Sequence, residues 1–159
     1  MDLNAELQRQ TDLKFMAEAI VEARRGYAEN GIPIGSVLVV NGRILGRGHN
    51  RRVQQGNPIL HGEMDAFQNA GRQKAAVYAR ATLYSTLSPC TMCGGTAVLY
   101  KIPRIVIGEN RTVATTTLCE DWLRGQGIEV VNLDLQECVD LMTEFIQRFP
   151  EVWHEDIGT

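Results

Sequence analysis

Residues 88–93 read Ser-Pro-Cys-Thr-Met-Cys, and residues 60–63 read Leu-His-Gly-Glu. A proline is common at the first position of a helix, because its missing N–H would have no partner there. The first stretch therefore predicts a helix that begins at Pro89 or Cys90 and runs to residue 101, and the second leads into an expected helix over residues 63–73. Both stretches place chemically reactive side chains at helix N-termini.

Three of these side chains are of the types that bind zinc, namely His61, Cys90 and Cys93. Cysteines at positions i and i+3 of a first helical turn point the same way, so both sulfurs can reach one ion. The positive end of the helix and the metal both lower the thiol pKa. We therefore predict one zinc ion per chain, with three protein ligands and the fourth position open to water.

Glu63 stands two residues after His61, close enough to face that water without being a ligand. The order H-x-E followed by P-C-x-x-C is the signature of the zinc deaminases. Zinc lowers the pKa of its water from 15.7 to about 7, and a carboxylate can then carry protons from water to the substrate. We predict a hydrolytic deaminase in which Glu63 is the catalytic acid and base.

Other uses of the two cysteines are a redox pair and a closed structural zinc site. A redox pair needs a thioredoxin-like context, which is not visible in the sequence. A structural site needs a fourth ligand, and the candidates do not stand at a tight ligand spacing from the first three; they are Cys119, Cys138, His49 and His154. A zinc-stabilised binding module without turnover is the alternative that is not an enzyme.

The 159 residues fit one domain, 1–159, without repeats or linkers. Asn41-Gly42 predicts a β-hairpin, Pro150 is expected to end the last helix, and residues 51–60 are expected to form a loop. This order of elements predicts an α/β layered domain with a mixed sheet. The expected strands are 34–40, 43–49, 82–86, 105–107 and 130–133, and the other expected helices are 13–27, 118–124 and 135–149.

The composition excludes some partners. The formal net charge is −3 and basic residues occur only in short pairs, so a nucleic-acid phosphate backbone is not an expected partner. No apolar run approaches the roughly 20 residues that cross a bilayer. Residues 1–6 lack the basic start and apolar core of a secretion signal, which predicts a cytoplasmic protein with reduced cysteines.

Beyond the zinc motif, the chain resembles the fungal-type cytosine deaminases of the cytidine/deoxycytidylate deaminase superfamily. The resemblance runs through residues 32–35, 45–50, 60–63, 83–90 and 108–110 and through the tail at 153–158. It implies a three-layer α/β/α fold with a five-stranded mixed sheet, a homodimer, and conversion of cytosine to uracil and ammonia in pyrimidine salvage.

The resemblance also implies substrate contacts. Asn50 is expected to bond the pyrimidine carbonyl, the Gly62 backbone to meet the base, and Asp156 to accept from a ring N–H. Trp153 is expected to form an aromatic wall, with Leu87 and either Ile32 or Ile34 lining the pocket. For three of them a structural role is the alternative: Asn50 as a turn cap, Trp153 as a core cover and Asp156 as a solvated charge.

The chain departs from the fungal pattern at two places. Val113 stands where the fungal enzymes carry phenylalanine, which weakens the stacking wall. Met64-Asp65 also differs. Asp65 either supports the active-site residues from behind or is a charge on the helix surface, and we expect the latter. These departures leave the base open between cytosine and another amino-heterocycle such as guanine. A tRNA adenosine deaminase is a further alternative, against which the acidic balance argues. We expect residues 150–157 to act as a lid.

Overall fold

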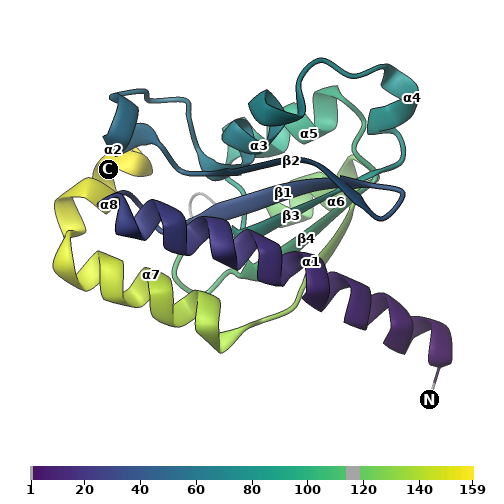
Figure 1. Ribbon diagram of the computed structural model, residues 1–159, viewed down its shortest axis with the longest axis horizontal. Coiled ribbons are helices and arrows are strands. Elements are labelled where there is room, and N and C mark those ends of the chain that lie inside the picture. Colours follow the sequence, from purple (N-terminus) through teal and green to yellow (C-terminus); the bar gives the residue numbers. More distant parts are fainter. Residues whose placement is uncertain (1, 114–118) are drawn as a thin grey trace.

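A five-stranded mixed sheet forms the centre of the computed structural model, which describes residues 2–113 and 119–159 (Figure 1). The strand order is β2-β1-β3-β4-β5. β1 is antiparallel to both neighbours, whereas β3, β4 and β5 are parallel. The predicted mixed sheet is therefore confirmed. The strands are β1 (Gly35–Val40), β2 (Arg43–His49), β3 (Ala81–Leu87), β4 (Arg104–Glu109) and β5 (Glu129–Asn132).

Helices cover both faces of the sheet, which confirms the three-layer architecture (Figure 1). One face carries α3 (Gly62–Ala70), α5 (Thr91–Leu99) and α6 (Glu120–Gly125), and the other carries α1 (Leu3–Ala28) and α7 (Gln136–Arg148). Three short helices lie outside these layers: α2 (Arg52–Gln55), α4 (Ala75–Tyr78) and α8 (Pro150–Asp156). None of the helices among the described residues is long and apolar enough to span a bilayer.

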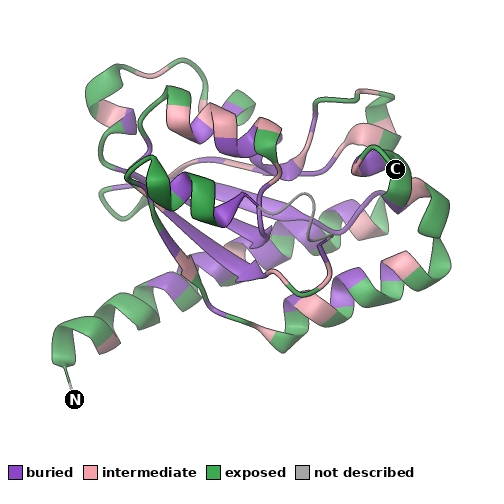
Figure 2. Cartoon of the chain, turned by 180° about the vertical axis from the view of Figure 1, so that it is seen from behind, coloured by how far each residue is buried: buried purple, intermediate pink, exposed green. Residues whose placement is uncertain are grey.

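Strand β1 is buried along its whole length because both faces of the sheet are covered. Val37 and Val39 pack with α1 and α7, whereas Leu38 and Val40 pack with α3 and α5. This alternation follows from the two-residue repeat of a strand. Figure 2 shows the buried sheet between helices whose outer faces are exposed. The apolar run at residues 37–40 therefore marks a central strand.

Several boundaries differ from the sequence-based expectations. Helix α1 begins at Leu3, ten residues before the expected start at residue 13, and its first turns extend beyond the sheet (Figure 1). They are mostly exposed, so no apolar stripe announces them. The expected loop over 51–60 contains α2, and α4 was not expected. Pro150 does end α7, but it also begins α8, because proline suits a first helical position.

Other expectations are confirmed. Asn41 and Gly42 both have positive φ, 51° and 74°, as the two central residues of a type I′ hairpin turn require. The helix expected over 118–124 is α6, which begins at Glu120; residue 118, where the helix was expected to begin, lies outside the described residues. The helix expected to start at Pro89 or Cys90 is α5, with Cys90 as its N-cap residue.

A buried ion pair ties α1 to the sheet. Arg104, at the start of β4, donates to both carboxylate oxygens of Asp12 at 2.7 and 2.8 Å, and Tyr84 donates to Asp12 at 2.9 Å. Burial alone raises the pKa of Asp12, but the bonds from Arg104 and Tyr84 outweigh it and leave the pKa below its usual value. The folded state therefore favours the ionised carboxylate.

We expect Asp12→Asn to lower the free energy of unfolding by about 3 kcal/mol at neutral pH, because Arg104 then loses its main partner. Asp12 has a lower pKa folded than unfolded, so its contribution is complete above the unfolded pKa, near 3.8, and is lost as the pH falls through the folded pKa. Urea unfolding of both proteins between pH 7 and pH 3 measures the difference. If the difference in unfolding free energy between the two proteins stays constant or widens on acidification, the stabilising role of the Asp12 carboxylate is contradicted.

Candidate active site

Two helix N-termini meet at the sequence-predicted metal site. His61 is the N-cap residue of α3 and Cys90 that of α5. Their carbonyl groups accept the first helical bonds, from the Asp65 N–H at 2.9 Å and from the Gly94 N–H at 2.8 Å. Cys93 lies one turn into α5 and is buried. The motif spacing thus becomes a three-residue cluster because each stretch starts a helix at the same end of the sheet.

The donor atoms of this cluster fit a tetrahedral zinc site. The Cys90 and Cys93 sulfurs are 3.8 Å apart, and the Cys90 sulfur lies 3.6 Å from His61 Nδ1. Ligands held tetrahedrally at zinc distances of about 2.3 Å (S) and 2.1 Å (N) are separated by about 3.8 Å (S···S) and about 3.6 Å (S···N). Among the described residues, the group of His, Cys, Asp or Glu able to hold a metal consists of these three.

Of the three ligand groups, only Cys90 is in its deprotonated, metal-binding form before an ion binds. Hydrogen bonds from Cys93 and His61 outweigh burial and lower the pKa of Cys90 to about 4, so this sulfur is a thiolate at neutral pH. Burial lowers the pKa of His61, but Cys90, Asp156 and Glu63 raise it to about 9. A metal therefore takes an ionised thiolate and displaces protons from the remaining ligands.

Glu63 lies in the first turn of α3 and is 4% exposed. Ser85, on β3, donates to its Oε1 at 2.5 Å. Burial and the nearby Cys90 charge raise the pKa of Glu63, against the bonds from Cys93 and Ser85. Glu63 is therefore a buried carboxyl group that can hold or release a proton. Sequence reasoning missed Ser85. Its only signal in the sequence is the two-residue repeat of a strand, which places it on the same face of β3 as the residues two positions before and after it.

The C-terminal helix α8 brings Asp156 into the site. Its side chain is 2% exposed, and its carboxylate accepts from Asn50 Nδ2 at 3.2 Å. It also lies 3.3 Å from Arg52 Nη1 and 3.6 Å from His61 Nε2. Burial raises the pKa of Asp156, although His61, Asn50 and Arg52 oppose it. The alternative of a solvated terminal charge is therefore wrong.

A small cavity of about 30 Å³ separates the metal cluster from α8. Trp153 of α8 and Ile157, the residue after this helix, line one side, and Leu87 and Ile34 line it from the sheet side. The full lining is Ile34, His61, Glu63, Leu87, Ser88, Cys90, Val113, Trp153, Asp156 and Ile157.

The other expected contacts have structural roles as well. The Asn50 Oδ1 accepts from the backbone N–H of Arg52 at 3.0 Å, so Asn50 does cap the turn after β2. Trp153 is 4% exposed and packs in the core with Ile32 and Phe145 while it also lines the cavity. Gly62 lies where a Cβ would be 3.0 Å from the Ile34 carbonyl oxygen, so its backbone packs against the chain entering β1.

Asp65 is not a surface charge, and this expectation is wrong. Its side chain is 2% exposed and accepts from the backbone N–H of His49 and from Arg51 Nε.

The four residues considered as a fourth zinc ligand lie outside the metal cluster. His49 contacts Glu22 and Glu29, and the Cys119 sulfur donates to the Pro89 carbonyl at 3.1 Å. The remaining two candidates are Cys138, in the core beside α1, and His154, which is exposed.

Comparison with known proteins identifies the class to which this fold and site belong. The sequence model of the family described as "Cytidine and deoxycytidylate deaminase zinc-binding region" matches residues 9–109, which include His61, Glu63, Cys90 and Cys93. The chain belongs to this family and is a zinc-dependent deaminase.

Individual relatives have different substrates. The chain is 47% identical to a cytosine deaminase of Candida albicans over 148 residues, which cover 92% of this chain and 97% of that protein. It is 41% identical to a tRNA-specific adenosine deaminase of Bacillus subtilis over 61% of each chain. The fold is also similar to that of a guanine deaminase from Nitrosomonas europaea, with a TM-score of 0.70 and 21% identity over 82% of each chain.

Proposed function

We propose that this protein hydrolyses cytosine to uracil and ammonia. The observation that carries the proposal is the arrangement of the His61–Cys90–Cys93 cluster beside the buried Glu63, under a tail that supplies Asp156. The similarity to the Candida albicans cytosine deaminase supports it, because it extends over nearly the whole of both chains. Similarity to the Bacillus subtilis tRNA-specific enzyme covers a smaller part.

In this proposal His61, Cys90 and Cys93 hold one zinc ion, which supplies hydroxide near neutral pH. Glu63 is the catalytic residue that moves protons. It takes one proton from water and delivers it to the ring nitrogen beside the reacting carbon. It then takes the second proton from the hydroxyl group added to that carbon and gives it to the amine, so that the C=O bond forms as the C–N bond breaks and ammonia leaves. Its burial keeps bulk water from competing for these protons, and Ser85 fixes the direction of its Oε1.

The remaining residues bind and orient the base. Asn50 and Asp156 already lie within hydrogen-bonding distance of each other, so one can donate to the ring carbonyl while the other accepts from a ring N–H. The Gly62 backbone meets the edge of the base, and Trp153 and Leu87 form apolar walls. Because the cavity is only about 30 Å³, a pyrimidine enters when α8 moves away and is enclosed when it returns.

A panel of free bases and nucleosides tests the proposal. Purified zinc-loaded protein is expected to release ammonia from cytosine faster than from guanine, cytidine or adenosine, and to leave tRNA unedited. Activity on guanine but not on cytosine contradicts the proposed substrate and means that the protein acts on purine bases. Editing of tRNA with a steep salt dependence contradicts it in favour of the tRNA-specific enzymes.

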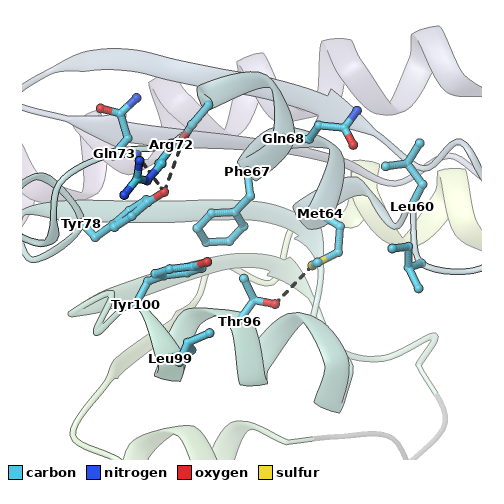
Figure 3. Close-up of a pocket in the computed structure, with 12 residues that line it drawn as sticks. Leu60, Met64, Phe67, Gln68, Arg72, Gln73, Tyr78, Thr96, Leu99 and Tyr100 are labelled. Atoms are coloured by element: carbon cyan, nitrogen blue, oxygen red, sulfur yellow. Dashed lines mark hydrogen bonds between the residues drawn. The ribbon is translucent and has the colours of Figure 1, made fainter.

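We further propose that two copies pair through a groove on the zinc-bearing side of the sheet. The groove has a volume of about 590 Å³ and lies between α3 and α5, with Met64, Phe67 and Tyr100 among its walls (Figure 3). Leu99 and Ile59 at its rim are 69% and 55% exposed, and apolar side chains gathered around one groove are typical of a protein–protein contact. A second copy presents the same groove, as a two-fold interface requires.

Leu99→Arg is expected to convert a dimer into a monomer at micromolar concentration, because it places a charge in the apolar contact. Sedimentation velocity measures the change. The matched control is Leu7→Arg, on the exposed first turns of α1, which should leave the dimer intact. A monomeric wild-type protein, or a dimeric Leu99→Arg variant, excludes this interface.

The chemistry also suggests where the protein works. Uracil and ammonia are products of pyrimidine salvage, so we propose that pathway and a cytoplasmic location. The four cysteines are free, which fits a reducing compartment.

A further inference from the structure

The carboxylate of Asp65 bonds to the chain on both sides of Asn50. It lies in the first turn of α3 and is 2% exposed. Its Oδ2 accepts from the backbone N–H of His49 at 3.0 Å and from the Nε of Arg51 at 2.9 Å. One oxygen of the helix that carries Glu63 therefore fixes both sequence neighbours of Asn50.

Asn50 itself is held at each of its polar ends. Its backbone N–H donates to the Ile34 carbonyl at 2.9 Å, its Oδ1 accepts from the Arg52 N–H at 3.0 Å, and its Nδ2 donates to Asp156 at 3.2 Å. The residue is 0% exposed. The side chain of Asn50 keeps its direction through its bonds to Arg52 and Asp156. A shift of the backbone at residues 49–51 would therefore change the direction of this side chain.

The carboxylate reaches this backbone because β2 approaches α3 very closely. A Cβ at Gly48 would lie 2.5 Å from the Ala66 nitrogen and 2.6 Å from Asp65 Oδ2. A Cβ at Gly46 would lie 2.2 Å from the Ala66 carbonyl oxygen. All three distances are shorter than real side chains allow, so the two glycines are what lets β2 come close enough for Asp65 to bond to it. On the opposite side, the His49 ring contacts Glu22 of α1, which fixes the same segment from α1.

We propose that Asp65 is a positioning residue for base recognition. This inference rests on the proposed role of Asn50 in binding the substrate. Its oxygen is bonded to the segment after β2, and it acts on the base through Asn50. Its loss impairs binding of the base and leaves proton transfer by Glu63 in place.

The test is steady-state kinetics of zinc-loaded Asp65→Ala and Asp65→Asn with cytosine. Misplacement of a binding group by roughly 1 Å is costly, so the KM of Asp65→Ala is expected to rise about tenfold or more. The kcat is expected to stay within about twofold, because the lost interaction concerns binding. Asp65→Asn keeps an oxygen acceptor for the His49 N–H and is expected to give a smaller rise.

Asn69→Ala is the matched control. Asn69 lies one turn further along α3 and donates to the Arg47 carbonyl at 2.7 Å, so it also joins α3 to β2 without flanking Asn50. If Asp65 only stabilises the fold, both alanine variants lower the melting temperature and neither changes KM. That result overturns the proposal, as does an unchanged KM in Asp65→Asn when Asp65→Ala does not fold.

A second readout does not depend on the substrate. The side-chain NH₂ signals of Asn50 in ¹⁵N spectra of the zinc-loaded protein, assigned with Asn50→Asp, are expected to shift or broaden in the Asp65 variants and to persist in Asn69→Ala. Wild-type protein without activity on cytosine contradicts the proposed function, and these signals then decide the positioning role alone. Unchanged signals in a folded Asp65 variant overturn it.

Discussion

A Glu63→Gln enzyme is expected to lose deamination by about 10,000-fold while it keeps one zinc ion per chain. The amide has the shape of the carboxyl group and can still accept the hydrogen bond from Ser85, but it cannot carry protons. The buried position allows no water-exposed group to replace it. Ammonia release at saturating cytosine measures turnover, and elemental analysis measures zinc.

Glu129→Gln, the same chemical change in β5, serves as the control and is expected to retain activity. Two results contradict the account of Glu63. If the Glu63→Gln variant turns over cytosine at the wild-type rate, another group moves the protons. Loss of zinc from a folded Glu63→Gln protein means that Glu63 is a ligand.

Deletion of residues 150–159 is expected to lower kcat/KM by about 100- to 1000-fold. The deletion removes Asp156, which bonds to Asn50, and Trp153, which lines the cavity and packs on Phe145. The site then opens to water, which weakens every electrostatic interaction within it. Kinetics with cytosine measure the effect, normalised to bound zinc.

Deletion of residues 158–159 alone is the matched control, because both residues are exposed and lie beyond α8. Since the longer deletion also removes core contacts, Asp156→Asn provides a second variant with the helix intact and is expected to raise the KM for cytosine. A folded protein that lacks residues 150–159 and retains wild-type kcat/KM excludes the lid.

Each half of the metal cluster was predictable because its geometry is local, and the deaminase signature indicated that the two halves meet. Cys90 and Cys93 are one helical turn apart, and Pro89 marks the start of their helix. His61 and Glu63 likewise belong to a helix start. The contact between Asn50 and Asp156 joins residues 106 positions apart, and it depends on how α8 packs against the rest of the fold. No local spacing predicts such a contact, so only the family resemblance indicated it.

Asp65 shows why other features escaped prediction. An acidic residue in a first helical turn is favoured by the helix dipole and is usually exposed. Its burial here follows from Gly46 and Gly48, which let β2 approach α3 at distances that a side chain prevents. The early start of α1 escaped for a different reason. Its first turns bury little, so they are helical without an apolar stripe to reveal them.

The central claim is that this chain holds zinc with two sulfurs and one imidazole and leaves one position for solvent. X-ray absorption at the zinc edge of freshly purified protein tests it most directly. We expect two sulfur neighbours at about 2.3 Å and two nitrogen or oxygen neighbours at about 2.0–2.1 Å. A third sulfur neighbour, with Cys119 as its source, or protein that is folded and active without zinc contradicts the account.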